Sequence, residues 1–246
     1  MSEVIKNIPT VAEIQQKLIE KLRPSGWADF LKGHLQSSDF TKIIEYLVQE
    51  NSEGRRFTPA LKQLFTAFEK CPVDTVKVVI IGQDPYPYTG VASGLAFSCE
   101  NKGKPEASLR YILGAIERTV PYENLDKIVG EEMYDLSRWA KQGVLLLNSA
   151  LTTEVGKIGR HVDVWRPFMD YMVDMLNYRE SGLVWIMMGK QAQRYEGLVG
   201  EEHHTILKCT HPAYAAYLKS SEWDCADVFN KCNKQLAEYK KDKILW

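Results

Sequence analysis

The apolar residues of the chain follow two patterns. The first pattern is a set of short, continuous apolar runs. The earliest run is too short and too rich in β-branched residues for a helix, so it predicts a buried strand. Three later runs have the same character, although Lys208 interrupts the last of them. The predicted strands span 76–81, 144–147, 183–188 and 205–210.

The second pattern is helical, with apolar residues three or four positions apart. The predicted helices span 11–22, 40–49, 108–118, 136–142 and 191–199. Two more are expected to begin after Asp163 and Asp227 as N-caps, and Ser38 or Asp39 is expected to cap the helix over 40–49. Thr58 and Pro59 predict another helix start, because proline is favoured at the first helical position. The apolar stripe that follows is expected in the core: Leu61, Leu64, Phe65 and Phe68.

Strands that alternate with helices predict an α/β fold. We expect a central four-stranded parallel sheet flanked by helices on both faces. The chain has 246 residues, of which 45% are hydrophobic, enough for one sizeable core. No Pro/Gly/Ser-rich linker, repeat or low-complexity segment divides the sequence. Residues 1–246 are therefore interpreted as a single domain.

Net charge and cysteine content exclude few classes of function. The net charge of −1 gives no support for DNA binding, because basic residues supply much of the affinity for phosphates. Five cysteines without C-x-x-C spacing predict free thiols in a reducing compartment and no zinc site. The adjacent pair His203 and His204 is interpreted as a surface loop. The mixed polar first residues and the lack of a membrane-length apolar run predict a cytoplasmic protein that does not contact a membrane.

Polar or glycine-containing signatures follow all four predicted strands. Asp84 follows the first strand, Asn148 the second, the pair Gly189 and Lys190 the third, and His211 the fourth. Each residue taken singly is well explained as a turn or capping residue. Parallel strands, however, place all their carboxyl ends at one edge of the sheet, where ligands bind in open α/β folds. We therefore expect Asp84, Asn148 and His211 to converge on one pocket.

The run Gly-Gln-Asp-Pro-Tyr at 82–86, continued through Phe97 and Ser98, resembles the water-activating loop of family 1 uracil-DNA glycosylases. Later segments match that family in its order: Leu-Leu-Leu-Asn at 145–148, Met-Gly-Lys at 188–190 and His-Pro at 211–212. The resemblance extends from about Trp27 to Trp246. It implies hydrolysis of the bond between uracil and deoxyribose in DNA, without a metal or another cofactor.

The resemblance also implies roles for the matched residues. Asp84 is expected to orient water and stabilise the sugar cation. His211 is expected to act as a neutral hydrogen-bond donor to uracil O2, together with the main-chain N–H of Gln83. The amide of Asn148 offers the acceptor and the donor that uracil N3–H and O4 require. Phe97 is expected to stack on the base, and Tyr86 to press against C5, where thymine carries a methyl group.

The expected DNA contacts follow less directly from the sequence. Ser108, after the segment 104–107, resembles the family's proline-rich loop that touches phosphate, although the loop here has lost prolines and gained Glu106. Gly189 and Lys190 resemble a second such loop, and Pro87 and Ser93 stand where the family commonly has histidines.

A third expected DNA contact follows the strand-end histidine and comprises Pro212, Ala213 and Tyr214. In this segment Ala215 occupies the position of the family's intercalating leucine, and Tyr214 is the predicted substitute, with Ala215→Leu expected to speed duplex cleavage. The alternatives are that the wedge is missing, or that Tyr214 and Tyr217 are ordinary aromatic residues of a surface loop. The implied partners are uracil-containing DNA, single- or double-stranded, and proteinaceous glycosylase inhibitors. The protein is expected to be a monomer.

Two other functions compete with this interpretation. One is a non-catalytic DNA-binding protein that has kept the glycosylase fold, which the intact Asp84, Asn148 and His211 disfavour. The other is a nucleotide-binding α/β protein, which the lack of a Gly-rich phosphate loop after the first strand disfavours. Release of free uracil from DNA, in chelator and without nucleotide, separates all three.

Overall fold

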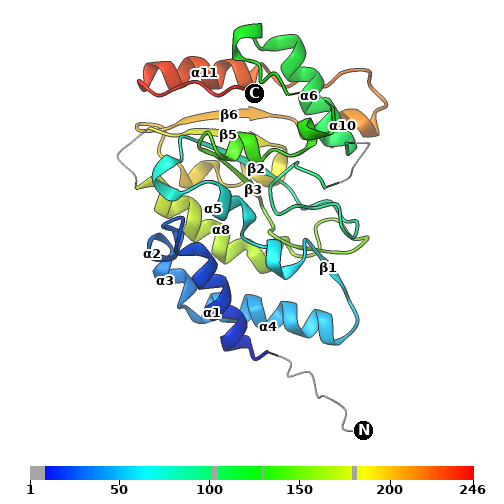
Figure 1. The fold of residues 1–246 in the computed structure, drawn as a ribbon, viewed down its shortest axis with the longest axis vertical. Coiled ribbons are helices and arrows are strands. Elements are labelled where there is room, and N and C mark those ends of the chain that lie inside the picture. Colours follow the sequence, from blue (N-terminus) through cyan, green and yellow to red (C-terminus); the bar gives the residue numbers. More distant parts are fainter. Residues whose placement is uncertain (1–8, 101–104, 129, 179–181) are drawn as a thin grey trace.

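A computed structural model of the chain describes residues 9–100, 105–128, 130–178 and 182–246. At its centre four fully parallel strands lie in the order β3-β2-β5-β6 (Figure 1). Their bounds are β2 (Val78–Gly82), β3 (Val144–Asn148), β5 (Val184–Met188) and β6 (Thr205–Cys209). The first three are buried along their whole length, as expected for strands covered on both faces. The predicted four-stranded parallel sheet is confirmed.

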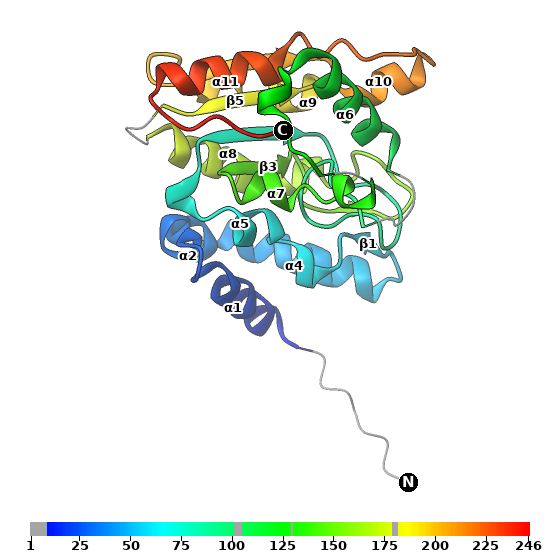
Figure 2. The same ribbon diagram turned by 45° about the horizontal axis from the view of Figure 1, so that its top comes forward.

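Helices cover the sheet from two sides (Figures 1 and 2). On one side lie α6 (Ala107–Thr119), α10 (Pro212–Tyr217) and α11 (Val228–Glu238). On the other lie α5 (Thr66–Lys70) and α8 (Val162–Asn177). Two short helices pack against strands, α7 (Ser137–Ala140) on β3 and α9 (Lys190–Gln193) on β5, and the 3₁₀ turn η5 (Glu196–Leu198) packs on α8. The remaining 3₁₀ turns are η1 (Leu61–Gln63), η2 (Val73–Thr75), η3 (Tyr122–Asn124) and η4 (Gly130–Tyr134).

An N-terminal group of helices adds a further layer outside α8. It comprises α1 (Val11–Leu22), α2 (Trp27–Phe30), α3 (Lys32–Leu35) and α4 (Ser38–Ser52). Helix α4 packs on α8, and α1 packs on α4. The segment after α4 forms β1 (Phe57–Thr58), which pairs antiparallel with β4 (Thr153–Glu154). This small sheet joins the N-terminal layer to the loops beyond the carboxyl end of β3.

Several helix boundaries differ from the sequence predictions. Thr58 does not cap a helix, because it pairs with Thr153 in β1, and its peptide bond to Pro59 is cis. The apolar stripe after it divides between η1 and α5, although Leu64, Phe65 and Phe68 are buried as expected. The predicted cap of α4 is wrong by one residue, since the Oγ of Ser37 accepts the N–H of Phe40.

The other differences lie in the second half of the chain. Helix α8 begins at Val162 after His161, so Asp163 lies in the first turn, where it pairs with Arg166. A carboxylate there still favours the helix dipole. The predicted helix over 191–199 is divided into α9 and η5, and helix α10 was not predicted at all. Asp227 does precede α11, but without a side-chain hydrogen bond to the helix N-terminus. Two expectations rest partly on residues outside the described ones: the cytoplasmic location on residues 1–8, and the phosphate-contacting loop on Lys104.

Candidate active site

The strand register brings the predicted site residues to one edge of the sheet. Gly82 ends β2 directly opposite Asn148, which ends β3. A Cβ atom at Gly82 would lie 2.7 Å from the Asn148 Oδ1 and 2.8 Å from the Phe97 Cζ. Glycine is therefore required at this position, because any side chain would displace the two residues that are expected to hold the base.

Tyr86, Phe97 and Asn148 line a single small cavity at this edge, as the sequence predicts. The hydroxyl of Tyr86 donates a 2.9 Å hydrogen bond to the main-chain oxygen of Phe97. Phe97 has a φ of +65°, in the left-handed region that bulky residues rarely adopt. Backbone strain of this kind is concentrated at functional sites, where the surroundings hold it in place. The Tyr86 hydroxyl is one such support, and no pattern in the sequence indicates it.

Asp84 presents one engaged and one free carboxylate oxygen. Its Oδ2 accepts the main-chain N–H of Gly159 at 2.6 Å and the side-chain Nε2 of Gln83 at 3.3 Å. Its Oδ1 is buried and has no hydrogen-bond partner among the described residues. Burial raises the pKa of Asp84 above its ordinary value, and the two hydrogen bonds oppose that change. A free, desolvated carboxylate oxygen of this kind can accept a proton from water or face a developing cation.

His211 is held as a neutral hydrogen-bond donor. The main-chain N–H of Ala213 donates to its Nδ1 at 3.2 Å, so the ring proton resides on Nε2. Burial lowers the pKa of His211 from 6.5 to about 4, which keeps the ring uncharged at neutral pH. Gly189, at a φ of +89°, lies so close that a Cβ would be 2.7 Å from the Cβ of His211. The ring centroids of His211 and Phe97 are 5.7 Å apart.

The predicted site residues lie in two adjoining groups: Asn148, Tyr86, Phe97 and His211 form one, and Asp84 forms the other. Asn148, Tyr86 and Phe97 line one small cavity, and the His211 ring lies next to the Phe97 ring. Asp84 adjoins the pocket through the continuous segment from Gly82 to Tyr86. A carboxylate and a neutral donor arranged around one pocket can stabilise opposite charges as a bond between them breaks.

The predicted DNA-contact residues are placed less uniformly. Lys190 and Ala213 are exposed, whereas Ser108 in the first turn of α6 and Pro212 in α10 are buried. The main-chain N–H of Ala213 is already used by His211.

The wedge candidates on α10 differ sharply in exposure. Tyr214 is 55% exposed, whereas Ala215 is only 5% exposed. Because α10 packs on α6 and Ala215 is among its buried residues, Ala215 does not face solvent as an intercalating leucine would.

The site also contains a residue that sequence reasoning missed. Gly159 lies on an exposed loop between β4 and α8, far from Asp84 in sequence, and contributes only a main-chain N–H. No side-chain pattern can reveal such a contact. The two glycines of that loop, Gly156 and Gly159, were the only signal of an unusual backbone, and both have positive φ.

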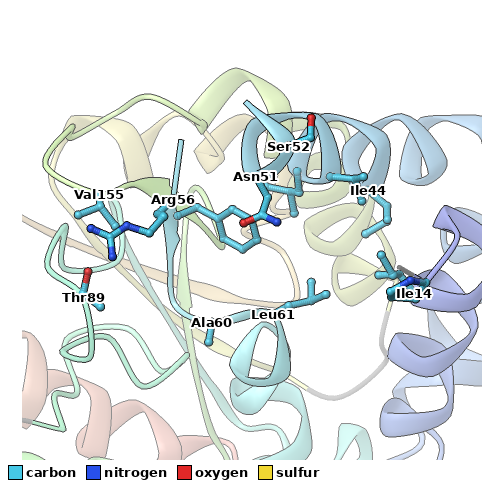
Figure 3. Close-up of a pocket in the computed structure, with 13 residues that line it drawn as sticks. Ile14, Ile44, Asn51, Ser52, Arg56, Ala60, Leu61, Thr89 and Val155 are labelled. Atoms are coloured by element: carbon cyan, nitrogen blue, oxygen red, sulfur yellow. The ribbon is translucent and has the colours of Figure 1, made fainter. Parts of the chain in front are cut away.

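A separate apolar cavity of about 510 Å³ lies between α1, α4 and the segment 56–61 (Figure 3). Ile14, Ile44 and Leu61 point into it, and Arg56 lies at one end. None of the predicted site residues lines it. It therefore plays no part in the site described above.

The described part of the chain contains neither a metal-binding group nor a membrane-spanning helix. Among the described residues, no three His, Cys, Asp or Glu side chains are grouped so that they could hold a metal ion. Of the pair predicted to form a surface loop, His203 does lie in an exposed turn, whereas His204 is buried with both ring nitrogens bonded to main-chain groups. None of the described helices is long and apolar enough to cross a membrane.

Comparisons with known proteins identify a family. Residues 68–237 match the model of the uracil DNA glycosylase superfamily. The uracil-DNA glycosylase of Francisella tularensis subsp. novicida is 34% identical over 225 residues, covering 89% of this chain and 97% of that protein. That of Pseudomonas aeruginosa is 35% identical over 227 residues, covering 90% and 93% respectively.

Solved structures of uracil-DNA glycosylases superpose well on this chain. The crystal structure of mimivirus uracil-DNA glycosylase superposes with a TM-score of 0.79 at 25% identity, covering 93% of this chain and 88% of that one. A mimivirus UNG variant, Y322L, solved in complex with UGI, superposes with a TM-score of 0.80 at the same identity. The fold and the resemblance inferred from sequence are thus confirmed, and the chain belongs to the uracil-DNA glycosylase superfamily.

Proposed function

We propose that this protein is a family 1 uracil-DNA glycosylase, which hydrolyses the bond between uracil and deoxyribose in DNA and leaves an abasic site. One observation supports it above the others: a buried carboxylate with a free oxygen, Asp84, and a neutral donor, His211, lie beside the small cavity that Asn148, Tyr86 and Phe97 line. Breaking this bond develops positive charge on the sugar and negative charge on the base. The carboxylate of Asp84 can stabilise the positive charge on the sugar, and the N–H of His211 can stabilise the negative charge on the base.

Asp84 acts on the sugar. Its Oδ2 is fixed by Gly159 and Gln83, which leaves Oδ1 to orient the attacking water and to stabilise the cation. Preorganised charge of this kind is usually the largest contribution to catalysis, because it requires no rearrangement as the bond breaks.

His211 acts on the base. Its Nε2–H donates to uracil O2 as negative charge develops there, supported by the main-chain N–H of Gln83. A neutral imidazole suits this role, because the low pKa of His211 prevents it from being protonated before the reaction begins.

Selectivity comes from the pocket. Asn148 accepts from uracil N3–H and donates to O4, whereas cytosine presents the inverse pattern. Tyr86 excludes the thymine methyl group, and Phe97 stacks on the base. The base must leave the duplex to reach this pocket, as glycosylase substrates do. Ser108, Gly189, Lys190, Pro212, Ala213 and Tyr214 are the proposed DNA contacts, with Tyr214 as the wedge.

The proposed partners follow from the same family. A mimivirus UNG was solved in complex with UGI. We therefore expect a proteinaceous glycosylase inhibitor to bind this chain as well. A monomeric state and a cytoplasmic location, both expected from the sequence, remain predictions.

The deciding experiment is release of free uracil from a uracil-containing oligonucleotide, measured in chelator and without nucleotide. We expect release from this substrate and none from matched oligonucleotides that contain cytosine or thymine. DNA binding without release would identify a non-catalytic binding protein. Release that requires a nucleotide or a metal would contradict the proposed mechanism.

A further inference from the structure

His161, at the start of α8, is a fully buried histidine that the mechanism above does not use: its side chain is 0% exposed. Its Nδ1 lies 2.9 Å from the Oγ1 of Thr152. That same oxygen accepts the indole N–H of Trp165 at 2.7 Å, so the Thr152 hydroxyl hydrogen is available to His161. Nδ1 is then the acceptor, and the ring proton resides on Nε2.

The Nε2 of His161 faces a buried carboxylate. Oε2 of Glu50, on α4, lies 3.7 Å away, and Glu50 is only 2% exposed. Neither atom has a hydrogen-bond partner among the described residues. Hydrogen bonding to Arg55 lowers the pKa of Glu50, and burial lowers the pKa of His161. The pair is therefore a carboxylate facing a neutral N–H donor.

This pair lies at one end of the loop that reaches Asp84. At the other end, the N–H of Val155 donates to Arg56 and that of Gly156 donates to Pro87. Between the two ends, residues 156–160 are exposed to solvent. Gly159 lies within this exposed stretch, two residues before His161, and carries the N–H that holds Asp84. Within the loop, Lys157 O accepts the Thr153 hydroxyl and Arg160 pairs with Glu154. The position of Gly159 therefore depends on these contacts and on where the ends of the loop are fixed.

We propose that Glu50 and His161 form a positioning pair, which holds the loop over 155–161 so that the Gly159 N–H stays on the Asp84 Oδ2. The inference rests on the catalytic role of Asp84 proposed above. It gives the N-terminal helical layer a part in catalysis, because α4 supplies the carboxylate. Glu50 and His161 touch neither Asp84 nor the pocket and act only through the loop.

The test is single-turnover cleavage of a uracil-containing oligonucleotide by the full chain carrying His161→Gln or Glu50→Gln. Displacement of a catalytic group by about 1 Å can cost on the order of a hundredfold in rate. We expect each variant to lower the cleavage rate at saturating enzyme at least about tenfold on that scale, with substrate affinity nearly unchanged. Glu50→Gln keeps the shape of the side chain, so it remains informative if His161→Gln does not fold.

His204→Gln is the matched control. His204 is also buried, with Nδ1 accepting from Leu183 N–H and Nε2 bonded to Asn177 O, both at 3.0 Å. It lies at the amino end of the sheet, away from Asp84. We expect this variant to lose stability without the selective loss of cleavage rate. An equal loss of rate in His204→Gln and His161→Gln would overturn the positioning role.

A second experiment introduces His161→Gln and Glu50→Gln separately into protein that already carries Asp84→Asn. If they act through Asp84, they should slow this protein little further. An undiminished further loss in that background would overturn the inference while leaving the role of Asp84 intact. Near-normal cleavage by Asp84→Asn alone would instead refute the proposed mechanism.

Discussion

The main-chain N–H of Gly159 donates a 2.6 Å hydrogen bond to the Oδ2 of Asp84, across a separation of 75 positions in the chain. The contact fixes one carboxylate oxygen and leaves the other unbonded in a buried site. A carboxylate held in this way cannot turn its free oxygen away from the substrate without breaking a charge-assisted hydrogen bond. The rate-determining chemistry should therefore depend strongly on the charge of Asp84.

Asp84→Asn is expected to slow uracil release by roughly a hundred- to a thousandfold, the scale on which loss of one preorganised electrostatic group acts. The amide retains an oxygen that can accept the Gly159 N–H, so the fold and most of the substrate binding should persist. Single-turnover kinetics and DNA-binding titrations measure the two effects separately. Turnover close to that of the unaltered protein would remove Asp84 from the mechanism.

The same substitution should stabilise the protein at neutral pH. Burial raises the folded-state pKa of Asp84, so the ionised carboxylate destabilises the folded state relative to a neutral group. As pH falls through this raised pKa, Asp84 becomes protonated and the unaltered protein recovers that stability. Thermal unfolding should therefore give a higher Tm for Asp84→Asn at neutral pH, with the difference shrinking in acid. A lower Tm at neutral pH would contradict the assignment.

The pH dependence of cleavage should show an acid limb and a flat neutral region. Activity requires Asp84 to be ionised and His211 to be neutral. The pKa of His211 is about 4, so the ring is neutral at neutral pH, and burial raises the pKa of Asp84, so the carboxylate loses its charge at a higher pH than an ordinary aspartate does. Single-turnover rates should show no transition near 6.5, the ordinary value for imidazole. A transition there that disappears in His211→Gln would show that the ring titrates normally.

The pocket assignment predicts altered base selection. Asn148→Asp should admit cytosine, because a carboxylate accepts from the cytosine amino group but cannot donate to uracil O4. Tyr86→Ala should admit thymine by opening space at C5. Because Tyr86 also supports Phe97 through its hydroxyl, Tyr86→Phe is the control that removes the hydrogen bond while keeping the bulk. If neither Asn148→Asp nor Tyr86→Ala releases its new base from suitable oligonucleotides, the pocket is assigned wrongly.

The strands and the convergence of Asp84, Asn148 and His211 were predictable, because both follow from local patterns and from the geometry of parallel sheets. The errors arose where distant segments decide the structure. Thr58 carries an ordinary helix-start signal, but its pairing with Thr153 places it in a strand. The Gly159 contact to Asp84 uses main-chain atoms alone, and the Glu50–His161 pair joins segments more than a hundred positions apart. Neither leaves a sequence signature.

The last prediction concerns the wedge that holds the flipped base outside the duplex. The sequence raised two expectations: that Tyr214 replaces the intercalating leucine, and that leucine at position 215 would restore it. The first remains open, and the exposure of Tyr214 supports it, because a side chain that is 55% exposed can reach DNA. The burial of Ala215 argues against the second. The larger isobutyl side chain of leucine there should overpack the contact between α10 and α6, at a cost of about 1–3 kcal/mol.

Tyr214→Ala should therefore lower cleavage of duplex DNA much more than cleavage of single strands, in which no base stack has to be held open. Aromatic stacking contributes about 1–3 kcal/mol per base in single-strand binders, which sets the scale of the loss. Ala215→Leu should lower Tm without accelerating duplex cleavage. Tyr217→Ala is the matched control, because Tyr217 is a second exposed tyrosine on the same short helix. Equal losses on both substrates in Tyr214→Ala, or equal effects of the two tyrosine substitutions, would show that Tyr214 is not the wedge.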